Sequence, residues 1–268
     1  MDKFFYGDNP SQFGELRLPD TKGPHPVAIV IHGGFWRQAF SLELTREIAE
    51  DLTKHGWATW NIEYRRVGQK EAGWPNTLLD TAKACDYLTH LTEEYQLDLE
   101  KVVTIGHSAG GQLALWLAGR TKLSSDSELA YTPNPLPVAG AISLAGVIDL
   151  ESMYKVHQYR DETLSASPNN PTAELLSGSP EETPERYKEA SPIALVPLNV
   201  PQLLVHGSLD VNVPVGISHN YYRACEEAGD PIKLIELSSA EHFMLTDTTS
   251  EAWKVIREEM ELMLESLS

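Results

Sequence analysis

The pentapeptide Gly106-His107-Ser108-Ala109-Gly110 constrains the fold of this chain more than any other feature of its sequence. An apolar, β-branched run (KVVTI, residues 101–105) precedes it, and a helix-like run (QLALWLA, residues 112–118) follows it. A G-x-S-x-G sequence between a strand and a helix is typical of a sharp turn that places the serine above a sheet, with glycine where backbones approach closely. The context therefore predicts that Ser108 is a nucleophile at a helix N-terminus, where amide groups favour negative charge.

Short apolar runs alternate with longer amphipathic ones along the whole chain. This alternation predicts an α/β fold with a mostly parallel sheet and helices on both faces. Strands are expected at Val27–Ile31, Thr59–Tyr64, Val102–Ile105, Ala139–Leu144, Gln202–Val205 and Ile232–Leu237. Helices are expected near residues 41–55, 76–95, 109–120, 215–228 and 249–266. With 268 residues, 41% of them hydrophobic, the chain is expected to form one domain over residues 1–268.

Residues 150–199 interrupt the alternation, because they contain no convincing strand. The interval holds six prolines: Pro168, Pro171, Pro180, Pro184, Pro192 and Pro197. A long insertion in a compact domain is usually a lid or a binding loop. We therefore expect a small cap over the active site within the domain, the alternative being a surface excursion without function.

A second glycine-containing segment, His32-Gly33-Gly34-Phe35-Trp36, follows the first expected parallel strand. Acyl transfer passes through a tetrahedral intermediate whose oxyanion needs backbone N–H groups fixed in a dry site. Glycines allow such a loop to turn its amides inward, and the remaining donor is the amide after the nucleophile. The sequence thus predicts an oxyanion hole made by Gly34, Phe35 and Ala109. His32 is expected to anchor the loop through side-chain hydrogen bonds.

The acid and the base are expected after the last two strands, in the chain order Ser, Asp, His. Asp210 follows the strand Gln202–Val205, and His242 follows the next one, so both side chains reach the sheet edge that carries Ser108. His242 can then take the serine proton while Asp210 holds its tautomer. Asp149 is an alternative acid, although it is better placed to cap a helix that begins near Leu150.

Two other histidines are expected to be structural. His107 is adjacent to the nucleophile and points in another direction, and His206 precedes the acid loop.

Four aromatic residues are candidates for substrate binding. Phe35 or Trp36 is expected to line the acyl or aryl pocket, because both follow the oxyanion glycines directly. The alternative is that both brace the loop from inside. Tyr154 and Tyr159, together with His157 in the same insertion, can contact an aromatic leaving group or serve only in the packing of the cap.

Charge and cysteine content bear on partners and location. The net charge of −18 repels phosphate backbones and anionic lipid heads, so neither a nucleic acid nor a membrane is expected as a partner. The two cysteines, Cys85 and Cys225, are expected to be buried thiols and not a disulfide framework. The first residues, MDKFFYGDNP, lack the features of a signal peptide, so a cytoplasmic location is expected unless a leader has been removed.

No cofactor is expected. The histidines are scattered without a metal-ligand spacing, and no dinucleotide or P-loop glycine pattern follows a strand. The expected partner is a small-molecule substrate, and the sequence is compatible with a monomer or a homodimer.

Four segments together resemble one branch of the α/β-hydrolase superfamily. They are HGGFW (32–36), NIEYRR (61–66), GHSAGG (106–111) and HGSLDVNVP (206–214). They are similar to segments of the kynurenine formamidase-like and small bacterial carboxylesterase branch, and the resemblance covers residues 14–266. HGGFW looks like the H-G-G-x-W motif of arylformamidases and differs from the HGGG of hormone-sensitive-lipase-like esterases. The Tyr6-Gly7 start and a strand at Leu16–Pro19 also look like that branch.

The resemblance implies hydrolysis of short-chain esters or aryl formamides without a cofactor. We expect a serine esterase acting on small acyl or aryl esters, with arylformamidase activity as the main alternative. A peptidase of the prolyl-oligopeptidase type shares the acid loop, but this chain has no room for a propeller domain. A non-catalytic binding module on the same scaffold is a further alternative, which the complete Ser-Asp-His set disfavours.

Overall fold

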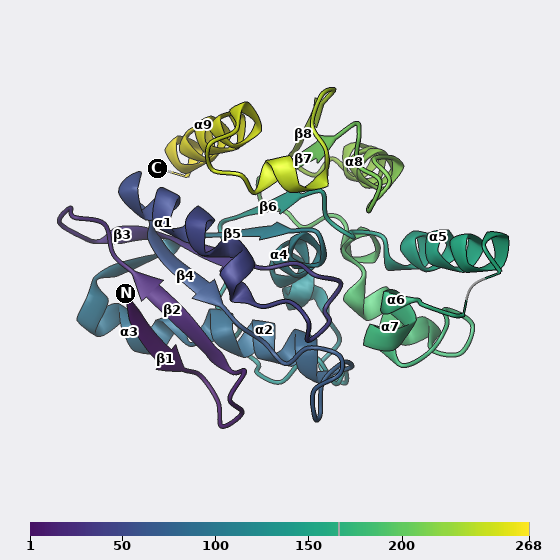
Figure 1. The fold of residues 1–268 in the computed structure, drawn as a ribbon. Helices are drawn as coiled ribbons and strands as arrows, with labels where there is room; N and C mark the ends of the chain where they lie inside the picture. Colours follow the sequence, from purple (N-terminus) through teal and green to yellow (C-terminus); the bar gives the residue numbers. More distant parts are fainter. Residues whose placement is uncertain (166, 268) are drawn as a thin grey trace.

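The computed structural model describes residues 1–165 and 167–267. At its centre is an eight-stranded sheet in the order β1-β2-β4-β3-β5-β6-β7-β8 (Figure 1). The strands are β1 (Asp2–Phe5), β2 (Phe13–Arg17), β3 (His25–Ile31), β4 (Ala58–Ile62), β5 (Leu97–His107), β6 (Gly140–Leu144), β7 (Gln202–Gly207) and β8 (Ile232–Leu237). From β4 to β8 all neighbours are parallel, so the predicted α/β class with a mostly parallel sheet is confirmed.

The central strands are buried on both faces, which explains why their sequences are apolar without alternation. In β3, Val27, Ile29 and Ile31 join the hydrophobic cluster on one face of the sheet. Ala28 and Val30 join the cluster on the other face. All five side chains are at most 1% exposed.

Helices cover the two faces as expected. They are α1 (Arg46–Lys54), α2 (Asn76–Asp86), α3 (Leu88–Tyr95), α4 (Ala109–Gly119), α8 (Gly216–Ala228) and α9 (Glu251–Ser266). The apolar residues of α1 and α9 belong to one cluster, and those of α2, α3, α4 and α8 belong to the other. The single helix expected over 76–95 is in fact two, which meet at Tyr87.

Two N-terminal strands form the edge of the sheet next to β4. β2 pairs antiparallel with β4, and β1 pairs antiparallel with β2. The strand expected at Leu16–Pro19 therefore begins earlier and ends at Arg17. β1 was not expected from the sequence, because its DKFF side chains are mostly exposed and give no buried apolar run.

The 150–199 insertion folds into α5 (Leu150–Thr163), α6 (Pro171–Leu176), α7 (Pro184–Ala190) and a 3₁₀ turn at Pro192–Leu195. In Figure 1, α5 extends away from the sheet, with α6 and α7 beside it. The insertion is fixed to α4 by two hydrogen bonds. Gln112 donates to the carbonyl oxygen of Ala190 (2.8 Å), and the indole of Trp116 donates to that of Glu189 (2.9 Å).

The carboxyl ends of β3, β5, β7 and β8 meet at one edge of the sheet. Ile31 is in register with Gly106, and Gly207 is in register with Leu237. The segments that follow these strands therefore converge, and they include the residues expected to act in catalysis. Over residues 1–165 and 167–267, no helix is long and apolar enough to cross a bilayer.

Candidate active site

Ser108 lies in the turn between β5 and α4, the nucleophile elbow. Its backbone has φ 57° and ψ −120°, a conformation that is costly for a residue with a side chain and persists only where the surroundings fix it. A Cβ atom at Gly106 would lie 2.0 Å from the carbonyl oxygen of Gly110, and one at Gly110 would lie 2.1 Å from that of Ile31. The close backbone approach that the sequence predicted at both glycines is therefore confirmed.

Asp210 and His242 are brought together from the loops after β7 and β8. The Nδ1 atom of His242 donates to the Oδ2 atom of Asp210 over 2.6 Å. The other carboxylate oxygen, Oδ1, accepts from the amides of Asn212 (2.8 Å) and Val213 (2.9 Å). This arrangement fixes the imidazole so that Nε2 is the nitrogen free to act as a base.

Hydrogen bonds keep Asp210 ionised although its side chain is fully buried. Burial by itself raises the pKa of this carboxyl, but bonds from His206 and His242 and from the Val213 amide outweigh it. The net result is an Asp210 pKa below its usual range. His206 was expected to be structural, without a contact to the acid, and its Nε2 atom lies 3.3 Å from Asp210 Oδ2. Its spacing of four residues from Asp210 was the sequence signal for this contact.

His242 lies close to the elbow. Its ring centroid is 4.4 Å from that of His107, the residue before Ser108. Among the residues that the structure describes, no hydrogen bond joins Ser108 Oγ to the His242 ring. Bonds between a nucleophile and its base are often long until substrate is bound.

His107 braces the base. Its Nε2 atom donates to the carbonyl oxygen of His242 over 2.9 Å. Burial, followed by the charge of His242, lowers the pKa of His107 to about 3, so its ring is neutral at physiological pH. His107 therefore has the structural role that was expected. Its contact with His242 was not evident from the sequence.

The HGGFW loop lies directly on the elbow. A Cβ atom at Gly33 would lie 2.6 Å from the carbonyl oxygen of His107 and 3.0 Å from the Cβ atom of Ser108. The next three residues have positive φ values: 99° at Gly34, 48° at Phe35 and 56° at Trp36. In a run of residues with left-handed backbone conformation, successive amide N–H groups point in directions that a strand or a helix does not allow.

Three amides near Ser108 have no partner. Within residues 1–165 and 167–267, no hydrogen bond is donated by the N–H groups of Gly34, Phe35 or Ala109. Ala109 is the first residue of α4, so its amide has no intrahelical acceptor. These are the groups expected to form the oxyanion hole, and they remain available for that role.

Trp36 corrects one expectation about the aromatic residues. Its side chain is 0% exposed, and its indole N–H donates to Gln112 Oε1 over 3.0 Å. A buried indole needs such a partner, and the left-handed backbone directs this one into the core. Trp36 therefore braces the loop and does not line a pocket. Phe35 is partly exposed and lies edge-on to His157 of α5, with ring centroids 5.2 Å apart.

We expect Phe35→Leu to change acyl selectivity and Trp36→Leu to change stability. Reshaping a hydrophobic pocket by a few atoms alters discrimination by about 10-fold or more, which the ratio of kcat/KM for butyrate and acetate esters will show. Trp36→Leu leaves a cavity and removes the donor to Gln112 Oε1, at a cost of about 2–4 kcal/mol in unfolding free energy. If Phe35→Leu leaves the acyl selectivity unchanged, Phe35 only braces the HGGFW loop and does not line the acyl pocket.

The two tyrosines of α5 lie on different faces. This helix buries Leu150, Met153, His157 and Asp161, and Tyr159 points away from that face with 71% of its surface exposed. The expectation that Tyr159 contacts substrate is therefore wrong. Tyr154 is half-buried, and its ring lies edge-on to Tyr187 of α7 at 6.2 Å. The contact matches the alternative in which it packs the cap.

The insertion is tied to the HGGFW loop. Arg37, the residue after Trp36, makes a bidentate ion pair with Glu174 of α6 (2.8 and 2.6 Å) and also donates to Asn169 (2.5 Å). With the Phe35–His157 contact, this pair joins the loop to both α5 and α6.

Asp149, the alternative acid, accepts from Ser152 N (3.0 Å) and caps α5, as its position before Leu150 had suggested.

Glu63 is a residue near the site that sequence reasoning missed. It directly follows β4, is 2% exposed and lies 2.9 Å from the Nε2 atom of His32. The Nδ1 atom of His32 donates to the carbonyl oxygen of Gly33 over 2.8 Å, so the predicted anchoring of the loop by His32 is confirmed. The sequence signal for Glu63 was a single acidic residue next to an apolar strand, in NIEYRR.

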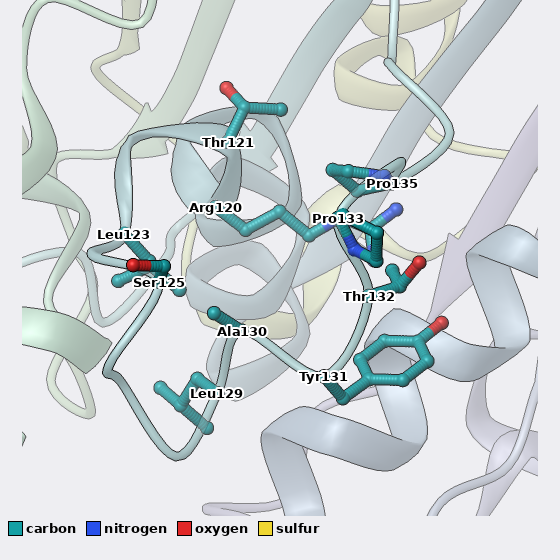
Figure 2. Close-up of a pocket in the computed structure, with 10 residues that line it drawn as sticks. All are labelled: Arg120, Thr121, Leu123, Ser125, Leu129, Ala130, Tyr131, Thr132, Pro133 and Pro135. Carbon is teal, nitrogen blue, oxygen red and sulfur yellow. The ribbon is translucent and has the colours of Figure 1, made fainter.

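A cavity of about 420 Å³ lies apart from these residues, beside the C-terminal end of α4 (Figure 2). Leu129, Tyr131 and Pro133 line it together with Arg120. The Arg120 guanidinium is already bonded to Asp86 and to two backbone carbonyls, so the cavity offers little recognition chemistry. Across the described residues, no group of His, Cys, Asp and Glu side chains could hold a metal ion.

The sequence matches a family model and several curated relatives. The model described as BD-FAE matches residues 15–224. The chain is 25% identical over 244 residues to the esterase LipC of Mycobacterium tuberculosis (strain ATCC 25618 / H37Rv), a match that covers 90% of the chain and 59% of LipC. It is 24% identical over 244 residues to the kynurenine formamidase of Danio rerio, covering 90% of the chain and 74% of that enzyme.

A solved structure described as a truncated form of carbohydrate esterase from gut microbiota shares the fold. The TM-score is 0.80 at 22% identity, and the match covers 99% of this chain and 97% of that one. The α/β-hydrolase fold expected from the sequence is thereby confirmed. The present chain spans less than two thirds of the length of LipC.

Proposed function

The chain belongs to the BD-FAE family, an α/β-hydrolase-type esterase family, and on this premise we propose that it hydrolyses small carboxylic esters through an acyl-enzyme intermediate. The observation that carries the proposal is the 2.6 Å bond between His242 Nδ1 and Asp210 Oδ2, formed at the sheet edge that carries Ser108. The relation to LipC, an esterase, supports the same reaction.

In the proposed acylation step, Ser108 Oγ attacks the ester carbonyl carbon while His242 Nε2 takes the hydroxyl proton. The carbonyl π electrons move onto oxygen, and the amides of Gly34, Phe35 and Ala109 bind the resulting oxyanion. When the intermediate collapses, the bond to the leaving oxygen breaks and His242 returns its proton to that oxygen. Asp210 stabilises the imidazolium between the two transfers.

Deacylation repeats the same steps with water. His242 removes a proton from a water molecule, whose oxygen attacks the acyl carbon. The same three amides bind the second oxyanion. When it collapses, the bond between the acyl carbon and Ser108 Oγ breaks, Oγ takes the proton back from His242 Nε2, and a carboxylic acid is released. The reaction needs no cofactor in this scheme.

The insertion and the cell compartment belong to the proposal as well. We assign residues 150–199 a cap role, supported by the Arg37–Glu174 pair and by the Phe35–His157 contact. A cytoplasmic location is supported by Cys85 and Cys225, which are free buried thiols. The proposed partner is the small-molecule substrate alone, for a monomer or a homodimer.

Arylformamidase activity is the second candidate, favoured by the relation to the Danio rerio kynurenine formamidase and by the HGGFW loop. A formamide is the harder substrate, because its nitrogen donates into the carbonyl and leaves badly unless protonated. His242 would have to deliver that proton, and the acyl pocket would have to exclude everything larger than hydrogen.

The expected result in a substrate panel is measurable hydrolysis of p-nitrophenyl acetate and butyrate, with cleavage of N-formylkynurenine weaker or absent. The measurement is kcat/KM for each compound on one preparation, with active sites counted by a fluorophosphonate probe. A kcat/KM for N-formylkynurenine well above that of the best ester would establish the formamidase instead. A protein that neither binds the probe nor turns over any compound would be a binding module.

A further inference from the structure

Glu63 is a carboxylate buried beneath the oxyanion loop. Its Oε1 atom accepts from the amide of Tyr64 (3.0 Å), and its Oε2 atom accepts from the amide of Leu42 (3.1 Å). Burial raises the pKa of Glu63, but the hydrogen bond and charge of His32, with the charge of Arg66 and the Tyr64 amide, outweigh it and lower the pKa overall. Glu63 is therefore ionised at neutral pH.

The partners of His32 define its protonation. One ring nitrogen lies 2.9 Å from the Glu63 carboxylate and the other lies 2.8 Å from the carbonyl oxygen of Gly33. A carboxylate and a peptide carbonyl can only accept, so both ring nitrogens must donate and the ring is an imidazolium. The ring is 0% exposed and stacks on Tyr64 with centroids 4.4 Å apart, a favourable position for a cation.

The carbonyl that His32 contacts belongs to a particular peptide unit. The C=O of Gly33 and the N–H of Gly34 are the two ends of one conjugated amide. A charged donor on the oxygen draws electrons from the nitrogen and makes its N–H a stronger donor. That N–H is one of the three unpartnered amides next to Ser108.

We propose that Glu63 and His32 form a buried ion pair that polarises the Gly33–Gly34 peptide and so strengthens the oxyanion hole. The inference rests on the proposed function, since it assigns these two positioning residues to the same site. Neither side chain touches the substrate. They act only through the Gly34 amide, so their effect is confined to states in which the carbonyl oxygen carries charge.

Glu63→Gln tests this directly, because it keeps the shape of the side chain and removes the charge. We expect kcat for p-nitrophenyl acetate to fall about 10-fold with KM nearly unchanged, less than the loss from deleting an oxyanion donor. Affinity for a trifluoromethyl ketone, which forms a hemiketal oxyanion on Ser108, should fall by a similar factor. Unchanged kcat and ketone affinity in a folded variant would overturn the inference.

Glu15→Gln is the matched control. Glu15 is also buried (3% exposed) and paired with arginines, Arg17 and Arg46, but it lies on β2. Its loss should lower the melting temperature without selective loss of ketone affinity. If Glu15→Gln weakens the ketone as much as Glu63→Gln does, the effect is general loosening of the fold and the inference fails.

Nitrogen NMR of the histidine rings provides a test that needs no activity. His32, assigned by its loss in His32→Gln, should show two protonated ring nitrogens in the wild-type protein and one in Glu63→Gln. A single ring N–H in the wild-type protein would refute the ion pair even if Glu63→Gln failed to fold. If the protein hydrolysed no ester while His32 carried both protons, the proposed function would fail and the ion pair would stand.

Discussion

Ser108→Ala is expected to lower kcat by about 10⁴-fold or more while the protein stays folded. The loss is large because the remaining groups cannot form a covalent acyl-enzyme without the hydroxyl. Folding should be unaffected for two reasons. The Ser108 side chain makes no hydrogen bond within the described residues, and a φ of 57° costs alanine no more conformational energy than it costs serine. The measurements are kcat for p-nitrophenyl acetate and the thermal unfolding midpoint.

Ser143→Ala is the control for this variant. Ser143 is on β6, is 1% exposed and lies beneath α4, and its hydroxyl has no hydrogen-bond partner among residues 1–165 and 167–267. Its removal should leave turnover and fluorophosphonate labelling intact. Substantial residual activity in Ser108→Ala with an unchanged pH profile would show that another residue is the nucleophile.

The parts of the fold that the sequence predicted are those in which local pattern and burial agree. The central strands are buried on both faces, so their apolar runs were visible, as Val27–Ile31 shows. The elbow could be predicted because its close backbone contacts leave room only for glycine at two positions with a fixed spacing. β1 was missed because its side chains are exposed, and the break at Tyr87 was missed because no glycine or proline marks it.

The parts of the site that the sequence did not predict depend on contacts between distant residues. The His32–Glu63 pair joins residues 31 apart, and the His107–His242 contact joins residues 135 apart. No local pattern reports either one. Trp36 was misplaced for a different reason: the direction of its side chain depends on a positive φ, which nothing in a five-residue motif specifies.

Buried histidines surround the proposed base in three different roles. His107 is neutral and holds the backbone of His242, while His206 donates to the carbonyl oxygen of Val213 and lies against Asp210. His32 supports the opposite side of the site through Gly33. In the proposed reaction, His107 and His206 therefore support residues that carry charge, and His32 supports a peptide group that binds the oxyanion. None of the three takes the place of His242 beside Asp210.

Asp210→Asn is expected to lower kcat by about 10⁴-fold, as the same change does in a Ser-His-Asp protease. The asparagine amide can keep one acceptor for the Asn212 and Val213 amides, but its NH₂ group then faces His242 Nδ1, which must become an acceptor. The proton moves to Nε2, and the imidazole can no longer take the Ser108 proton. The measurement is kcat/KM as a function of pH, with thermal unfolding to verify the fold.

Asp149→Asn is the matched comparison, because it makes the same chemical change at the alternative acid. Asparagine is as good an N-cap as aspartate, so α5 should keep its first turn and activity should change little. Asp210 also has a pKa below its usual range, so it stays ionised in mild acid and its charge should matter at every pH at which His242 can act. If Asp149→Asn lost more activity than Asp210→Asn at equal thermal stability, the acid would lie after β6, and the 2.6 Å bond to His242 would be structural only.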